Sequence, residues 1–189
     1  MHESAWEAAR QQFIRLLREH AVHYGPTTIE PEVVTDVLID PSRVTLRSDA
    51  LAFIEALLVP MLRQDRVEAV GGPAMGAIPL VTLMARQRWP AFYLRLGAQV
   101  HGRRSPISGT PPQPGMAVAL LEDLAATGTS LLRCCEVVQG LGARVVSLYA
   151  LVDREQGTRE RLAAHGLRYR PLITFSELVQ VAPDTGDAS

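Results

Sequence analysis

The chain contains no lysine, and all 19 of its permanently basic residues are arginines. The absence of lysine excludes the Gly-Lys-Ser/Thr signature of a nucleotide-binding P-loop. Because 20 acidic residues balance the arginines, the formal net charge is only −1, and the sequence lacks the positive charge that nucleic acids and anionic membranes attract. We therefore expect neither a nucleic acid nor a membrane among its partners.

Long apolar runs and spaced cysteines are also absent. No apolar stretch approaches the about 20 residues that cross a bilayer, and residues 1–20 form a charged, helical pattern rather than a signal peptide. The only two cysteines, Cys134 and Cys135, are neighbours on an expected helix, where adjacent side chains point in different directions. They indicate packed thiols rather than a disulfide or a metal site, and we expect a cytoplasmic protein.

The length of 189 residues and the hydrophobic fraction of 47% favour one domain, over residues 1–181, followed by a disordered tail over 182–189. Apolar runs and helical periodicity alternate through most of this domain. They predict strands at 67–70, 90–96, 118–121, 144–152 and 172–175, and helices at 48–62, 77–87, 129–141, 155–165 and 176–178. This alternation is typical of an α/β protein with a doubly wound, mostly parallel sheet.

The N-terminal segment is expected to form a small helix and hood in front of this sheet. An amphipathic helix over 5–19 ends before Gly25-Pro26, and the mixed segment 27–48 has strand-like pieces at 33–39 and 44–47. The segment 97–114 contains three glycines, four prolines and two adjacent arginines. That composition favours a mobile active-site loop rather than a linker between domains.

The stretch 117–132, AVALLEDLAATGTSLL, joins an apolar strand, two adjacent carboxylates and a loop of small residues that opens into a helix. Ligands of open parallel sheets bind at such strand ends. The loop 127–130 offers backbone N–H groups and hydroxyls that favour a phosphate, so Glu122 and Asp123 require a polyol or a metal rather than a second anion. A sugar phosphate with a metal-bound pyrophosphate meets both requirements. The alternative is a strand-to-helix turn with a solvated acidic pair.

This stretch resembles the phosphoribosyl diphosphate (PRPP) signature of type I phosphoribosyltransferases. The resemblance implies that the carboxylates of Glu122 and Asp123 hold the ribose hydroxyls at the catalytic centre. It also implies that the following loop binds PRPP, with the 5-phosphate held by residues 125–130. The residues of this loop are Leu124, Ala125, Ala126, Thr127, Gly128, Thr129 and Ser130.

Three further segments extend the resemblance to orotate phosphoribosyltransferases, over roughly residues 13–180. GGPAMGAIPL (71–80) resembles the family's pyrophosphate loop, YLRLGAQVHG (93–102) its catalytic loop, and DREQG (153–157) its Asp-Arg-x-x-Gly segment. Without the resemblance, the segment 71–80 is a weak glycine-rich turn, and the segment 153–157 is a helix-capping aspartate beside a surface arginine. The resemblance implies that the pyrophosphate contacts Ala74, Met75, Gly76, Arg95, Gln99 and His101, of which Arg95 and His101 are catalytic, and that the base contacts Arg154 and Ala126.

The sequence departs from the family pattern at several of these positions. Leu96 and Gln99 replace two lysines of the catalytic loop, the second of which reaches the neighbouring subunit's site in the family. Arg103 and Arg104 follow shortly after this loop. They either substitute for the second lysine or are solvated loop charges. The segment 28–36, TIEPEVVTD, lacks the family's Ser-Gly-Lys-x-Ser pattern, and Ala126 replaces a threonine.

The resemblance implies a glycosyltransferase of pyrimidine biosynthesis, which transfers a phosphoribosyl group from PRPP to a nitrogenous base, an orotate-like pyrimidine, with release of pyrophosphate. It further implies Mg²⁺ as cofactor, held mainly by PRPP with no direct protein ligand, and a homodimer that shares an active-site loop. The replaced lysines leave an alternative open, which is a catalytically weak or inactive regulatory protein that binds PRPP or a nucleotide.

Overall fold

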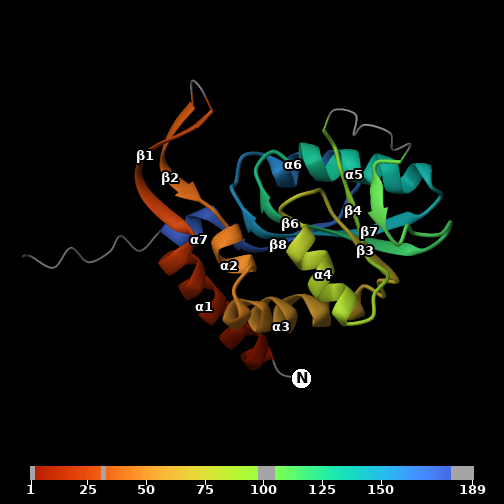
Figure 1. Ribbon diagram of the computed structural model, residues 1–189, viewed down its shortest axis with the longest axis horizontal. Helices are drawn as coiled ribbons and strands as arrows, with labels where there is room; N and C mark the ends of the chain where they lie inside the picture. Colours follow the sequence, from red (N-terminus) through yellow and green to blue (C-terminus); the bar gives the residue numbers. More distant parts are fainter. Residues whose placement is uncertain (1–2, 31–32, 98–104, 180–189) are drawn as a thin grey trace, which may run out of the picture.

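The computed structural model describes residues 3–30, 33–97 and 105–179 (Figure 1). At its centre lies a four-stranded sheet with the order β3-β6-β7-β8, in which every pairing is parallel. A short strand, β4, lies beside β3 through two parallel bridges. The bounds of these strands are Ala69–Gly71 (β3), Phe92–Leu94 (β4), Ala117–Ala125 (β6), Arg144–Asp153 (β7) and Tyr169–Thr174 (β8).

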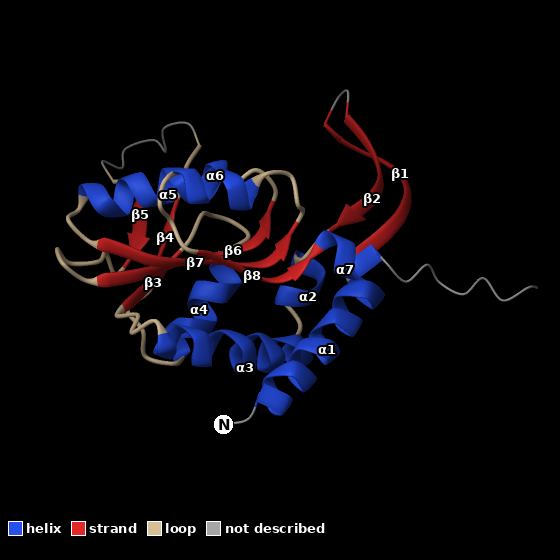
Figure 2. Ribbon diagram, turned by 180° about the vertical axis from the view of Figure 1, so that it is seen from behind, coloured by secondary structure: helices blue, strands red, loops and turns tan. Residues whose placement is uncertain are grey.

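Helices cover both faces of this sheet, as expected for a doubly wound α/β fold (Figures 1 and 2). One face carries α5 and α6, and the other carries α1, α3 and α4. The bounds are Glu3–His20 (α1), Ser48–Gln64 (α3), Ile78–Arg86 (α4), Thr129–Gly140 (α5) and Thr158–Ala164 (α6). Among the described helices, none is long and apolar enough to cross a membrane.

The position of β6 inside the sheet explains why its apolar run is continuous. Val118 and Leu120 pack in the core on the α5 side, whereas Ala119 and Leu121 pack in the core on the α3 side. Side chains alternate across a strand, so a strand buried on both faces needs apolar residues at every position. Cys134 and Cys135 of α5 are buried free thiols whose pKa values burial raises, which confirms the prediction of packed thiols.

The N-terminal segment differs from the sequence-based expectation. After α1, the strands β1 (Val22–Glu30) and β2 (Val33–Ile39) form an antiparallel hairpin that stands apart from the central sheet (Figure 2). Gly25 and Pro26 lie inside β1, where the pairing register shifts between Tyr24 and Thr27. A bulge tolerates a proline, which cannot donate to the ladder, and a glycine with φ +119°.

Other boundaries were also wrong. The last strand, β8, begins at Tyr169 and ends at Thr174, whereas the expected strand covered 172–175. Val44 and Thr45 belong to a short helix, α2 (Ser42–Thr45), rather than to a strand over 44–47. Part of the expected loop 97–114 is a strand, β5 (Ile107–Gly109), which pairs antiparallel with β4, while residues 98–104 and the expected tail 182–189 lie outside the described residues. The helix α6 begins at Thr158 rather than at residue 155, because Glu155 and Gly157 have left-handed φ values of 58° and 93°.

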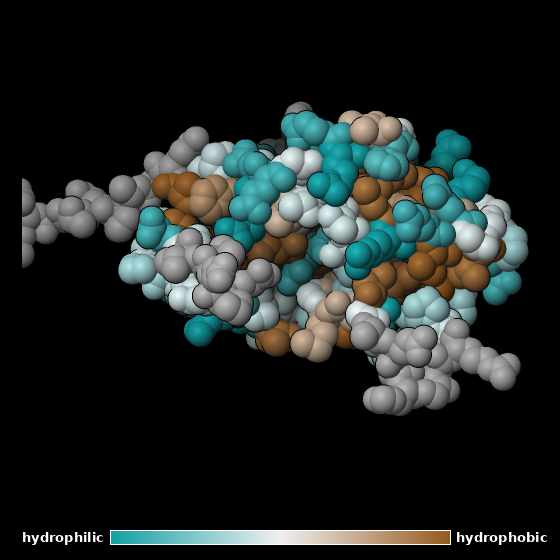
Figure 3. All heavy atoms as spheres, turned by 90° about the horizontal axis from the view of Figure 1, so that it is seen from above, coloured by the Kyte–Doolittle hydropathy of each residue, from teal (hydrophilic) through white to brown (hydrophobic). Residues whose placement is uncertain are grey.

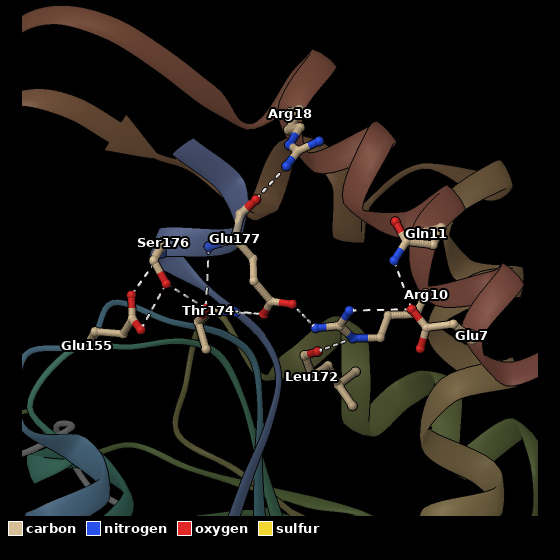
Figure 4. Close-up of polar contacts among 9 residues, drawn as sticks. All are labelled: Glu7, Arg10, Gln11, Arg18, Glu155, Leu172, Thr174, Ser176 and Glu177. Atoms are coloured by element: carbon tan, nitrogen blue, oxygen red, sulfur yellow. Dashed lines mark hydrogen bonds and ion pairs between the residues drawn. The ribbon is translucent and has the colours of Figure 1, made fainter. Parts of the chain in front are cut away.

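Hydrogen bonds join α1 to β8 and to α7 (Phe175–Val179), at the other end of the described chain, as Figure 4 shows. Arg10 donates to the carbonyl of Leu172 at 2.9 Å and pairs with Glu177. The second carboxylate oxygen of Glu177 accepts the N–H of Thr174 at 2.9 Å. Burial alone would raise the pKa of Glu177, but the hydrogen bonds from Arg10 and Thr174 outweigh it and hold that pKa below its usual range.

We expect Glu177→Ala to lower the free energy of unfolding by about 1 kcal/mol at neutral pH, a modest loss because the pair is partly solvent-screened. A carboxyl group whose pKa is lower in the folded state stabilises the fold at pH values above its unfolded pKa. This stabilisation is lost as the pH falls through the folded pKa. The difference from wild type should therefore shrink in acid. Urea denaturation at several pH values measures this difference, with Glu160→Ala, at an exposed position of α6, as the control. A loss that does not change with pH would contradict this account.

Candidate active site

The candidate site lies at the carboxyl ends of β3, β6 and β7, three neighbouring strands of the sheet. The loop after β3 approaches β6 so closely that its two glycine positions, 72 and 76, leave no room for a side chain. A Cβ at Gly72 would lie 2.2 Å from the carbonyl oxygen of Leu121, and a Cβ at Gly76 would lie 2.1 Å from a carboxylate oxygen of Asp123. The backbone at Gly76 therefore lies against the Asp123 carboxylate, and a cis peptide joins Ala74 and Met75 just before it.

The two carboxylates differ in their surroundings. Glu122 is only 9% exposed, and burial, together with the charge on Asp123, raises its pKa to about 8. It lies on the α5 side, where its charge adds to burial in raising the pKa of the Cys134 thiol. Asp123 faces Gly76 on the other side, and burial, with a smaller effect of Asp40, raises its pKa too. Adjacent residues of a strand point to opposite faces, which separates them.

The loop between β6 and α5 has the geometry of an anion site. Gly128 has a φ of +75° and precedes Thr129, the first residue of α5. The first amides of a helix have no intrahelical acceptor, so those of residues 129–131 are available to a ligand. The hydroxyl oxygens of Thr127 and Thr129 lie 3.0 Å apart. Arg161 of α6 donates from Nη1 to the Thr129 hydroxyl at 3.3 Å.

Two arginines at the site have buried nitrogens without an acceptor in the part of the chain that the structure describes. They are Nε of Arg154, after β7, and Nε and Nη2 of Arg95, after β4. The Arg95 guanidinium also lies 5.7 Å from the centre of the Tyr93 ring. An unsatisfied buried donor on a cation is costly, and an anionic ligand would remove that cost.

The segment that carries Arg154 is fixed on both sides. The N–H of Arg154 donates to the carbonyl of Ala125 at 2.8 Å, which joins it to the end of β6. The carboxylate of Glu155 accepts the N–H of Ser176 at 2.8 Å and its hydroxyl at 3.1 Å, which joins it to α7 (Figure 4). Asp153 accepts the N–H of Glu155 at 2.8 Å, a turn rather than the helix cap considered from the sequence.

The structure places the predicted residues that it describes at the carboxyl ends of β3, β4, β6 and β7. Gln99 and His101, with Arg103 and Arg104, lie outside the described residues. The sequence reasoning missed Glu155 and Arg161. Glu155 belongs to the DREQG motif, but no hydrogen-bond partner was expected for it. Arg161 could have been found from its position one turn into the helix that follows Arg154.

Two surface grooves, of about 850 and 710 Å³, lie away from this site. The first is lined by α1 and α3 and includes Trp6 and Met61, and the second is lined by α2, α3 and α4. Seen from above, hydrophobic side chains reach the surface in several separate places between hydrophilic ones (Figure 3). Volume alone therefore does not mark the site, whereas the carboxylates, the open amides and the unpaired arginine nitrogens do.

The parallel sheet, the acidic pair at its carboxyl edge and the adjoining anion loop define a type I phosphoribosyltransferase. No protein-family model matches the sequence. The orotate phosphoribosyltransferase of Synechocystis sp. is 35% identical over 178 residues, which cover 91% of this chain and 89% of that protein. On this similarity, the chain belongs to the orotate phosphoribosyltransferase family.

Solved structures agree with this assignment. The crystal structure of orotate phosphoribosyltransferase from Aeropyrum pernix gives a TM-score of 0.78 with 30% identity, over 89% of this chain and 96% of that one. The structure of the Mycobacterium tuberculosis H37Rv enzyme in complex with PRPP gives a TM-score of 0.72 with 29% identity, over 90% of this chain and 92% of that one. The expected fold class and family are thus confirmed.

We expect Glu122→Gln to stabilise the protein in a pH-dependent way. Because the folded state holds the Glu122 proton more tightly than the unfolded chain, ionisation of this carboxyl costs stability as the pH rises from its ordinary pKa of 4.5 towards 8. The uncharged amide avoids this cost, so the variant should gain on the order of 2–4 kcal/mol over wild type near pH 8.5 and little near pH 4.5.

The measurement is the free energy of unfolding across this pH range, with Glu136→Gln on the exposed side of α5 as the matched control. Curves for wild type and Glu122→Gln that run parallel at every pH would show that burial does not perturb this carboxyl.

Proposed function

We propose that this chain transfers a phosphoribosyl group from PRPP to orotate or a closely similar pyrimidine and releases pyrophosphate, as a glycosyltransferase of pyrimidine biosynthesis. The observation that carries this proposal is the junction at the end of β6, where Glu122 and Asp123 lead directly into an anion-binding loop. Few ligands need both a carboxylate pair and a phosphate cradle within one short loop. A ribose 5-phosphate does, because its hydroxyls donate to carboxylates while its phosphate accepts from amides.

The proposed roles follow the chemistry of each group. Glu122 and Asp123 would accept hydrogen bonds from the ribose hydroxyls, and the segment from Ala125 to Ser130 would hold the 5-phosphate. The amides of Met75 and Gly76 and the Arg95 guanidinium, with Gln99 and His101 from the catalytic loop, would hold the pyrophosphate. The Ala74 N–H, expected to take part as well, already donates to the carbonyl of Leu94 at 2.7 Å. Arg154 would pair with the base, beside Ala126. The unpaired buried nitrogens of Arg95 and Arg154 support these two roles.

The reaction needs this distribution of charge. Breaking the bond at the anomeric carbon leaves an oxocarbenium-like ribose and a pyrophosphate that gains negative charge. Arginine and amide donors aimed at the leaving group stabilise that charge as it develops. Carboxylates beside the ribose stabilise the cationic sugar, which favours the ionised form of Glu122 over the protonated form that burial favours in its absence.

We propose that Mg²⁺ enters the site with PRPP. The described residues contain no group of three or more His, Cys, Asp or Glu side chains that converges on one point. Glu122 and Asp123 offer oxygen donors, which suit Mg²⁺ through water or through the substrate's own oxygens. When bound, the ion would neutralise part of the pyrophosphate charge.

We further propose a single cytoplasmic domain over residues 1–181 that acts as a homodimer with a shared catalytic loop. Two large apolar side chains support a subunit interface, because Leu46 is 74% exposed and Met75 is 82% exposed. Met75 belongs to the pyrophosphate loop itself. A second subunit on this side would cover apolar groups that otherwise contact water.

Pyrophosphate release tests the proposed activity. The protein is incubated with PRPP and Mg²⁺ and with orotate, uracil or a purine base in turn, and we expect release with orotate above all. The double variant Glu122→Gln/Asp123→Asn should lose PRPP binding without losing stability, because its carboxylates serve the ligand rather than the fold. Binding of PRPP without release, for any base, would replace the enzyme with the regulatory, PRPP-binding alternative that Leu96 and Gln99 favour.

We expect Gln99→Lys to raise kcat with orotate more than any other single change in the loop. Pyrophosphate gains charge as it leaves, and a preorganised cationic donor typically contributes about 3 kcal/mol where a neutral amide offers only a dipole. Steady-state kinetics measures the effect. If Gln99→Lys changes little while Arg103→Ala or Arg104→Ala removes most of the activity, one of those arginines already supplies the charge.

A further inference from the structure

One face of α6 packs directly against the proposed phosphate loop. A Cβ at Gly128 would lie 3.3 Å from the Thr158 methyl group and 3.5 Å from Leu162. Both of these side chains are buried, at 1% and 0% exposure. Residues three and four apart share one side of a helix, so Thr158, Arg161 and Leu162 all face the loop. The buried neighbours fix where the helix places Arg161.

The guanidinium of Arg161 reaches the loop at a hydroxyl that a phosphate would also use. Its Nη1 donates to Oγ1 of Thr129 at 3.3 Å, and that oxygen lies 3.0 Å from Oγ1 of Thr127. The backbone is held as well, because the Arg161 N–H donates to the carbonyl of Gly157 at 3.1 Å. A guanidinium has five donors, so one bond to Thr129 leaves others for a ligand.

The charge balance of the site calls for such a group. The loop from Leu124 to Ser130 contains only neutral donors, and Glu122 and Asp123 precede it directly. A phosphate dianion beside two carboxylates is disfavoured unless a cation compensates for part of the charge. Arg95 and Arg154 belong to the proposed pyrophosphate and base positions. Among the described residues, Arg161 is the arginine whose guanidinium donates to a side chain of this loop, the hydroxyl of Thr129, whereas Arg154 bonds the loop only through its backbone N–H.

We propose that Arg161 is a direct ligand of the 5-phosphate of PRPP, which it binds together with the Thr129 hydroxyl. This inference rests on the proposed function and assigns one further binding residue to it. The guanidinium approaches the phosphate from α6, opposite the helix α5 whose amides bind the same group. One continuous segment, 153–161, thereby contributes to two subsites, with Arg154 at the base and Arg161 at the 5-phosphate.

The test compares Arg161→Gln with Arg159→Gln, which removes an equally exposed arginine two residues away on the same helix. Calorimetry measures binding of PRPP, ribose 5-phosphate and inorganic phosphate to the whole protein. We expect Arg161→Gln to weaken PRPP and ribose 5-phosphate alike by about tenfold, because one charge-assisted contact is lost, and to reduce the salt dependence of binding. Arg159→Gln should stay within about twofold of wild type, and Arg161→Lys should recover part of the loss.

Kinetics provides a second readout that a purely structural role would not move. In Arg161→Gln the KM for PRPP should rise while the KM for orotate and the melting temperature stay near those of wild type. Equal affinities in Arg161→Gln and Arg159→Gln, with wild type binding ribose 5-phosphate, would overturn the role of Arg161 alone. Failure of the wild-type protein to bind PRPP or ribose 5-phosphate would overturn the proposed function together with it.

Discussion

The parallel pairing of β6 with β3 on one side and β7 on the other is the constraint on which the rest of the structure depends. It buries β6 on both faces and brings the carboxyl ends of three strands to one edge. The two carboxylates follow the apolar run without a break, so they are carried into partial burial by the strand itself. Their high pKa values are the electrostatic cost of that placement.

The close approach of the loop after β3 to β6 shapes the candidate active site at this edge of the sheet. Glycine at positions 72 and 76 lets the loop after β3 approach β6 more closely than any side chain would allow. Gly76 then lies against the Asp123 carboxylate, and the anion loop before α5 follows from the end of the same strand, β6. We propose that a polyol with phosphate groups at two positions binds here, because it needs both hydrogen-bond donors and carboxylate acceptors.

The helices α1 and α7, at the two ends of the described residues, support the segment that carries Arg154. Glu155 joins the Arg154 segment to α7, and Glu177 joins α7 to Arg10 of α1 (Figure 4). The helix that begins the chain is therefore coupled, through two carboxylates, to the arginine proposed to pair with the base. The hairpin β1-β2 follows α1 directly, so α1 connects both to this hairpin and, through α7, to the proposed base position.

Local patterns allowed much of the fold and site to be predicted. The parallel sheet, most of its strands and helices, and the residues of the anion loop follow from apolar runs and from small residues at a strand end, because each depends on neighbours in the sequence. The β1 strand and the start of α6 could not be predicted in this way. Gly25 and Pro26 normally end a strand, and only the bulge in the hairpin shows how β1 accommodates them.

The sequence by itself determined that an acidic pair and a phosphate loop meet at the end of a buried strand. Only the tertiary structure decided that Glu122 and Asp123 face different sides, that Gly76 touches Asp123, and that Arg161 reaches Thr129. The physical reason is distance along the chain. Thr129 and Arg161 are 32 residues apart, and no local periodicity reports a contact that forms only when α6 packs against the loop before α5.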